Sequence, residues 1–360
     1  MPSGADPGAL DWTMTARSSA LIDWDAAADA GRRVGGRGPA TTPAQRDALR
    51  DDLRRIVPEA EALVVDATGL RIAGSASRPW VLSRAAWVRQ NLRSLQTLTE
   101  PLADRIGPVP WSELRRRSTG WQIGGLLGYA SRKVLGQYDA FVPADDEGLL
   151  YFVGPNILEA EARSRLAPAD FRFWIAAHEV THRVQFGATP WLRGHLAGLV
   201  ERYLRSMELD PARVAAQVRR AVERVREGGA PPGLGIVTYL LSDEQRELFG
   251  RMQGLMSLLE GHASFVMNEV SRGRVRDLAR LQRTMRERRR SIGSLERAFQ
   301  RASGFELKVR QYDAGERFVR AAVARLGMAG FNGVWAEAAN LPSPQEIADP
   351  DRWIARVGRA

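Results

Sequence analysis

The sequence predicts a mainly α-helical fold with a small β-hairpin or sheet. From Thr42 onward, apolar residues recur at helical spacing in one segment after another, as they do at Leu49, Leu53 and Ile56. Extended structure is indicated at residues 140–153, where two short apolar runs flank a Gly-containing loop of about five residues. The sequence has no internal repeat, no sustained heptad and no alternation of strands with helices.

The composition is that of an ordinary globular chain. It has 360 residues, 44% of them hydrophobic, and no cysteine, which excludes collagen-like, disordered and disulfide-stapled classes. Residues 1–20 are rich in Gly, Pro, Ser and Ala and are expected to form a flexible arm, with residues 21–360 as a single domain. The N-terminus lacks a secretory pattern, and the most apolar stretch, residues 121–130, is too short to span a membrane. We therefore expect a cytoplasmic protein with no membrane partner.

Several helices have recognisable ends or faces. Pro43 suits the first turn of a helix, and Ser83 suits the N-cap of a helix that carries Trp87. Gly124 and Gly128 fall on one face of a helical segment, where each glycine costs about 1 kcal/mol relative to Ala. Two glycines on one face therefore predict the close approach of a second backbone.

One helix stands out because it carries an HExxH motif at residues 178–182. Asp170 suits its N-cap, and Gly187 suits its C-terminal end. Apolar residues share one stripe of this helix with both histidines and with a glutamine. The members of the stripe are Phe171, Ile175, His178, His182 and Gln185.

The motif predicts a zinc site. Because the chain has no cysteine and only four histidines, a metal must be held by His, Asp or Glu. Two imidazoles four residues apart on one helical face bind zinc in HExxH proteins, and the glutamate between them serves as general base. We therefore assign His178 and His182 as Zn²⁺ ligands and Glu179 as the base. The alternative is a pair of packed core histidines.

A catalytic zinc needs a third protein ligand and an open position for water. His195 lies 13 residues after His182 and does not fit a short extension of the motif. The stronger candidates are Glu260 and His262, in a helix that begins near Ser242. These two residues lie about 200° apart around a helix, so one metal is not expected to take both. Helical periodicity does not choose between them.

The chain resembles the zincin-like metallopeptidase type 2 family of Actinobacteria and Chloroflexi, which is often labelled as associated with deazaflavin-cofactor biosynthesis. The HExxH helix and the Glu-Gly-His-Ala segment at residues 260–263 are the specific elements of the resemblance. It extends over most of residues 22–358. Supporting segments are residues 136–139, 153–156, 190–192, 310–315, 332–335, 341–342 and 353–357.

The resemblance implies a zinc-dependent hydrolase, with a peptide or protein as substrate. The Glu-Gly-x-Ala segment is similar to the element by which gluzincin peptidases supply a glutamate ligand, so Glu260 is the implied third ligand, with His262 as its substitute. Glu179 would activate a zinc-bound water and then pass the proton to the leaving amine. Tyr312 is the candidate oxyanion donor, unless it is an ordinary packed tyrosine. A zinc-stabilised scaffold without activity, and a hydrolase of a non-peptide amide or ester, are the alternatives.

The positive charge is concentrated in one segment. The chain carries a formal net charge of +10, and residues 272–310 hold 13 basic residues against four acidic ones. This segment is a solvated helical face, a surface for an acidic partner or substrate end, or a nonspecific nucleic-acid contact. No nucleic-acid-binding motif accompanies it, so no specific nucleic-acid partner is expected.

Overall fold

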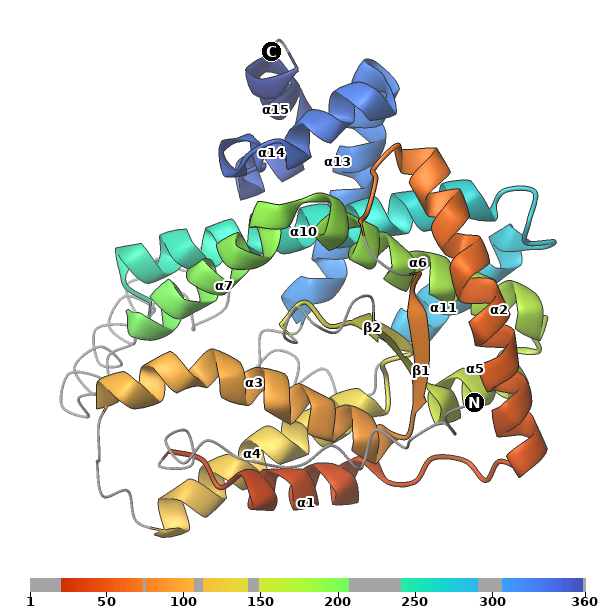
Figure 1. Cartoon of the computed structure of the whole chain (residues 1–360). Coiled ribbons are helices and arrows are strands. Elements are labelled where there is room, and N and C mark those ends of the chain that lie inside the picture. The colour runs from red at the N-terminus through yellow and green to blue at the C-terminus, as the bar shows by residue number, and fades with distance from the viewer. Residues whose placement is uncertain are drawn as a thin grey trace. The chain divides into compact units, whose positions relative to one another are not determined.

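The computed structural model describes residues 21–73, 76–106, 113–141, 149–206, 241–290 and 306–358. These residues form twelve α-helices and a sheet of three short strands, which confirms the mainly α-helical prediction (Figure 1). The predicted arm at residues 1–20 lies outside the described residues.

Contacts divide the chain into two compact units, and we describe each by itself. Unit 1 comprises Met1–Leu63 and Ala73–Arg183, and unit 2 comprises Val64–Ile72 and Val184–Ala360. Two of the three boundaries fall inside the helices α2 (Pro43–Thr68) and α6 (Pro168–Ala188), so each of these helices contributes residues to both units. The single-domain assignment of residues 21–360 stays a prediction.

Glycines bring two helices of unit 1 into close contact. α1 (Trp24–Gly35) packs against α4 (Glu113–Ser131) and α3 (Arg84–Ile106), and the three helices lie side by side in Figure 1. A Cβ atom on Gly124 would overlap the backbone of Ala27, and one on Gly128 would lie 2.5 Å from the Gly31 carbonyl oxygen. The predicted approach of a second backbone is therefore confirmed, and that backbone belongs to α1. The Ser83 hydroxyl caps α3 by accepting from the Ala86 N–H at 3.1 Å, as predicted.

The sheet of unit 1 contains β1 (Arg78–Leu82), β2 (Gly136–Tyr138) and β3 (Leu149–Val153) in the order β1-β3-β2. β3 pairs in parallel with β1 and antiparallel with β2, so β2 is an edge strand. The predicted hairpin is present, but its first strand is β2, which lies before the predicted residues 140–143. The Asp139 carboxylate accepts the Phe141 N–H at 3.0 Å, and this local turn ends the strand. Residues 142–148 lie outside the described part of the chain.

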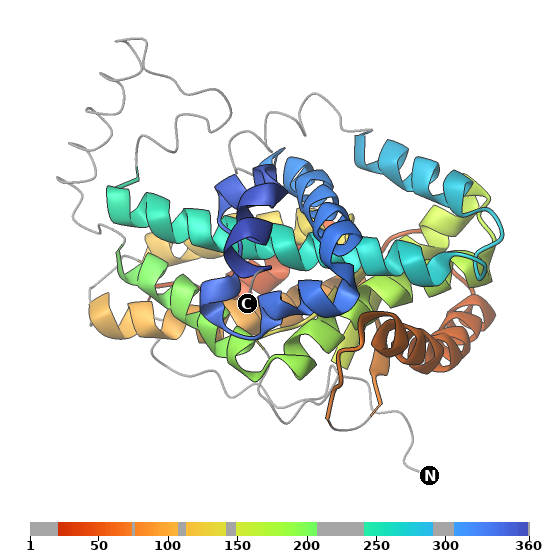
Figure 2. The ribbon, with the colours of Figure 1, turned by 90° about the horizontal axis from the view of Figure 1, so that it is seen from above.

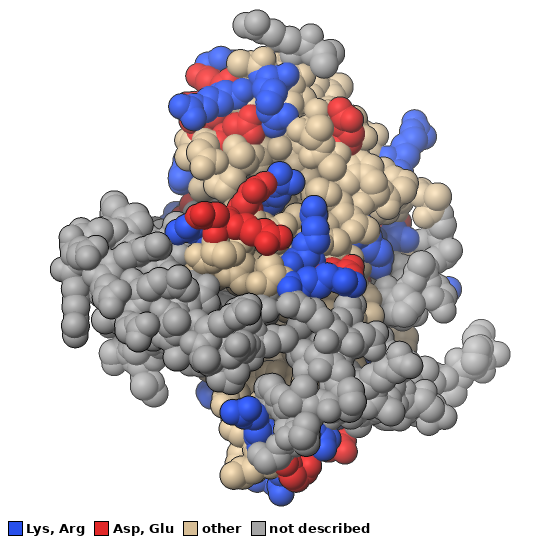
Figure 3. Space-filling model, turned by 90° about the vertical axis from the view of Figure 1, so that its left-hand side faces the viewer, with Lys and Arg blue, Asp and Glu red and all other residues tan. Residues whose placement is uncertain are grey.

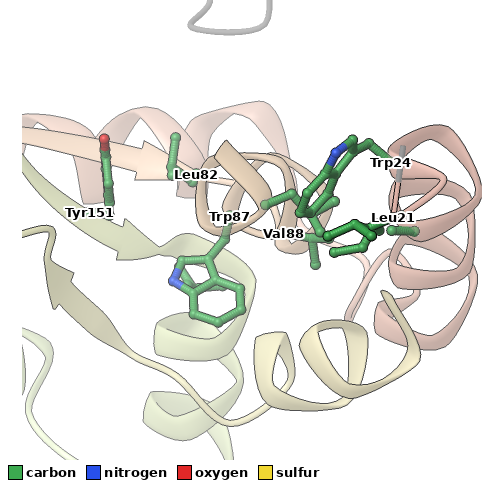
Figure 4. Packing of buried hydrophobic residues seen from close by; sticks show 10 residues of the cluster. Leu21, Trp24, Leu82, Trp87, Val88 and Tyr151 are labelled. Atoms are coloured by element: carbon green, nitrogen blue, oxygen red, sulfur yellow. The ribbon is translucent and has the colours of Figure 1, made fainter. Parts of the chain in front are cut away.

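Apolar side chains from helices and strands form the main core cluster of unit 1. Trp24 of α1, Trp87 and Val88 of α3 and Tyr151 of β3 are each no more than 5% exposed (Figure 4). Burying side chains of this size contributes about 1.5–3 kcal/mol each. The cluster therefore joins the sheet to the α1, α3 and α4 layer.

Unit 2 is built around two long helices that cross. α10 (Asp243–Ser271) begins with the predicted capping box, in which Ser242 and Gln245 bond each other's backbone N–H groups. α13 (Glu306–Phe331) crosses α10 in Figure 2, at a point where Gly261 and Gly315 meet with no room for a Cβ atom on either. This crossing lies directly beside Glu260.

Side-chain to backbone hydrogen bonds hold the C-terminal elements of unit 2 together. They are the short 3₁₀ turns Asn332–Trp335 and Ala338–Asn340, α14 (Pro344–Ala348) and α15 (Pro350–Val357). Trp353 is fully buried and donates to the Asn340 carbonyl oxygen at 2.7 Å. Arg356 donates to both carboxylate oxygens of Glu346, and these bonds lower the Glu346 pKa although partial burial alone would raise it.

Charged groups on the described surface are mixed in sign. On the face in Figure 3, basic and acidic side chains lie next to one another, and many arginines pair with a carboxylate three or four residues earlier, as Arg251 does with Glu247 at 2.7 Å. The core of the Arg-rich segment forms α11 (Leu278–Arg290), with Leu281 and Met285 buried and Arg283 exposed. Within the described residues, no helix combines the length and apolarity that a membrane span requires.

Candidate metal centre

The HExxH helix places two histidine rings together. α6 begins at Pro168, so Asp170 lies in its first turn instead of at its N-cap, and the helix ends one residue beyond Gly187. The His178 and His182 rings are both half-buried, and their centroids lie 4.9 Å apart in an edge-to-face arrangement. This is the geometry expected for imidazoles one helical turn apart on one face.

Two buried arginines form ion pairs that hold α6 within unit 1. Arg172 donates to both oxygens of Glu161, at 2.7 and 2.9 Å, and to Asp52 at 2.7 Å. Burial alone would lower the Arg172 pKa, but the bonded carboxylates outweigh it and the pKa is raised. Arg183, next to His182, donates to Glu61 at 2.7 Å. Because an unpaired charge at either place would be costly to bury, these pairs favour one position for the helix.

Glu179 faces the edge strand of the sheet. Its side chain is buried, and its Oε2 accepts the Tyr138 N–H at 3.1 Å. A Cβ atom on Gly136 would lie 2.6 Å from Glu179 Cγ and 2.7 Å from Oε1, so the carboxylate lies directly against the glycine backbone. The structure thus supplies one backbone donor and one close packing surface for the predicted general base.

The two candidates for the third ligand have different surroundings in unit 2. His262 is fully buried, its ring is stacked on Phe331 at a centroid distance of 5.4 Å, and its Nδ1 lies 2.9 Å from Gln185 Nε2. Glu260 is half-buried. His195 lies in α7 (Pro190–Arg205), in edge-to-face contact with Trp191.

Among the described residues, one His-His-Glu group has the makings of a metal site. Each of His178, His182 and Glu260 offers one ligand atom, and these atoms all lie within 4.8 Å of one another. Ligand atoms around a tetrahedral zinc lie about 3.4 Å apart, which is compatible with this 4.8 Å limit. Two imidazoles and one carboxylate also form the donor set of known catalytic zinc sites. The group fits zinc in number and kind of ligand, and it contains Glu260 instead of His262.

The sequence did not predict the contacts of three residues in this region, and the structure does not test the predicted role of a fourth. Gly136 and the Tyr138 N–H, which contact Glu179, carry no sequence signal of a role at the site. Gln185 was visible on the histidine stripe, but its partners on α10 were not. Tyr312 lies in α13, and its side chain is outside the described part of the structure. Its role as oxyanion donor stays a prediction.

Comparison with known proteins supports the fold and the family. A crystal structure from Chloroflexus aurantiacus, described as a "putative hydrolase with a novel fold", is 34% identical and has a TM-score of 0.70, and the match covers 94% of this chain and 100% of that one. None of the curated proteins matches this chain. The zincin-like metallopeptidase family matches residues 22–354. The chain therefore belongs to the zincin-like metallopeptidase family.

Proposed function

We propose that the protein is a zinc-dependent peptidase with His178, His182 and Glu260 as ligands and Glu179 as general base. The observation that carries the proposal is the His-His-Glu group beside a buried glutamate of the HExxH motif. The family and the hydrolase from Chloroflexus aurantiacus support a hydrolase, and the family's description supports a peptidase. The link to deazaflavin-cofactor biosynthesis stays a prediction.

Zinc, when bound, supplies Lewis-acid chemistry for a water molecule and a scissile carbonyl. The protein's own contribution is the proton transfer. The Glu179 carboxylate would accept the proton of the attacking water and later donate it to the leaving amine. The Tyr138 N–H donates to Glu179 Oε2 at 3.1 Å, and this bond limits the rotation of the carboxylate.

Helix continuity supports Glu260 as the third ligand. In unit 2, Gln185 of α6 donates to the carbonyl oxygen of Leu259 at 2.9 Å, and Leu259 directly precedes Glu260. Gln185 follows His182 by three residues, so the two share one face of α6. His262 uses its Nδ1 toward Gln185 and stacks on Phe331, which favours a packing role for that residue.

Metal content is the first test. The purified wild-type protein should contain one zinc per chain, and His178→Ala, His182→Ala and Glu260→Gln should each weaken zinc binding. Glu247→Gln, at an exposed glutamate of the same helix as Glu260, is the matched control and should bind zinc as the wild type does. A wild-type protein without stoichiometric zinc would refute the proposal.

Peptide hydrolysis is the second test. Wild type and Glu179→Gln should be compared on a broad peptide library, because removal of the base should lower cleavage by about 10²–10⁴-fold while zinc remains bound. Equal cleavage by both proteins would remove the enzyme assignment and favour a zinc-stabilised scaffold. Cleavage of ester or non-peptide amide substrates alone would assign the same chemistry to another substrate class, since the Lewis-acid chemistry that zinc would supply does not distinguish these carbonyls.

A further inference from the structure

We propose that Gln185 and His262 form a buried clasp that fixes the position of Glu260. The inference rests on the proposed function, because it assigns the two residues as positioning residues for the third zinc ligand. Both side chains are fully buried, and neither was assigned a metal-binding role by the geometry above.

The Gln185 amide nitrogen bridges the residues on either side of Glu260. Gln185 Nε2 lies 2.9 Å from the Leu259 carbonyl oxygen and 2.9 Å from His262 Nδ1. An amide nitrogen carries two hydrogens, so it donates to both acceptors at once. The carbonyl oxygen only accepts, which fixes the orientation of the amide, since the reverse orientation would set two oxygens against each other.

This orientation also fixes the role of the His262 ring nitrogen. Because the Gln185 amide nitrogen donates to it, Nδ1 is a hydrogen-bond acceptor. The ring is stacked on Phe331 at 25° and has an edge contact with Trp335 at a centroid distance of 5.4 Å. His262 therefore serves as a rigid acceptor that Gln185 can hold, and its Nδ1 is occupied.

The clasp holds a segment of α10 that two other contacts also hold in place. Gly261 meets Gly315 of α13 with no space for a side chain, and the Leu259 side chain is buried. The α10 backbone on both sides of Glu260 therefore has little freedom to shift along α13. Gln185 adds a third contact, from the part of α6 that belongs to unit 2.

The test is a double-mutant cycle on zinc affinity, measured by competition with a chelator under conditions where every variant is folded. Gln185→Leu should weaken zinc binding by about 10- to 100-fold, the usual effect of losing a group that orients a ligand. The same substitution in a Glu260→Gln background should change the affinity by no more than about twofold, because the ligand that Gln185 positions is already lost. An equal effect in both backgrounds would overturn the proposal.

Two further variants separate positioning from a general loss of stability. Gln185→Leu/His262→Phe removes both polar partners, so its unfolding midpoint should recover relative to Gln185→Leu while its zinc affinity stays weak. Val266→Ala, at a fully buried position elsewhere on α10, should lower stability and leave zinc affinity unchanged. Recovery of zinc affinity together with stability in the double variant would show a merely structural role. If the wild type itself binds no zinc, the proposed function fails, whereas normal zinc binding by Gln185→Leu overturns the clasp alone.

Discussion

Gly136→Ala should separate the position of the general base from the stability of the fold. The added Cβ atom would lie 2.6 Å from Glu179 Cγ, 2.7 Å from Oε1 and 2.9 Å from Cδ. An ordinary contact begins near 3.4 Å, so the glutamate side chain must move by about 0.8 Å. The atoms that must move belong to one flexible side chain, and Gly136 has no positive φ, so the backbone accepts alanine.

The displacement is large on the scale that matters for proton transfer. A misplacement of about 1 Å in a catalytic group costs on the order of 100-fold in rate. We therefore expect Gly136→Ala to lower kcat by about 100-fold on a library peptide that the wild type cleaves, with KM nearly unchanged. Zinc content should remain at the wild-type level, because the three atoms nearest to the new methyl group all belong to Glu179, which is not a predicted zinc ligand.

The matched control is Gly125→Ala in α4, where a Cβ atom meets nothing within 4 Å. This variant should keep wild-type kcat and gain up to about 1 kcal/mol of stability from helix propensity. The assay combines steady-state kinetics, zinc analysis and urea unfolding on the three proteins. A Gly136→Ala enzyme with kcat within twofold of wild type would refute the reasoning that the glycine positions Glu179.

Three further predictions concern the fold and the surface. Gly124→Ala should destabilise unit 1 by about 3 kcal/mol or more in urea unfolding, because the new methyl group meets the Ala27 backbone, which cannot rotate away. A loss of stability below about 1 kcal/mol would contradict the close packing of α4 against α1. Burial and two nearby arginines lower the His195 pKa below 6.5, so the folded state resists protonation; stability is highest above about pH 6.5 and falls as the pH drops through the folded-state pKa. His195→Gln should therefore lose less stability than wild type between about pH 7 and pH 5, and identical pH profiles would show that His195 does not cause the loss. Exposed arginines of α11 should retain the protein on an acidic polymer in a salt-dependent manner, and their replacement by glutamine should reduce this retention; the residues are Arg280, Arg283 and Arg286. Retention that does not depend on salt would instead indicate a solvated helical face.

The helices could be predicted wherever local signals were strong. Ser242 and Gln245 form the predicted capping box, and Gly124 was correctly interpreted as a point of close backbone approach. The sheet was predicted less well, because β1 pairs in parallel with residues of β3 that lie 71 positions further along the chain, and strand pairing depends on such distant partners. The edge strand β2 was displaced from residues 140–143 because a turn made by Asp139 ends it early.

The sequence by itself determined the HExxH arrangement, because the motif on one helix fixes the spacing of His178 and His182 and sets Glu179 between them through helical periodicity alone. Periodicity could not choose between Glu260 and His262, since both lie near the edges of one apolar stripe. Only the tertiary structure placed His262 Nδ1 against Gln185 and the Tyr138 N–H against Glu179. Those contacts join residues 77 and 41 positions apart, and packing between distant segments, which leaves no local pattern in the sequence, decides them.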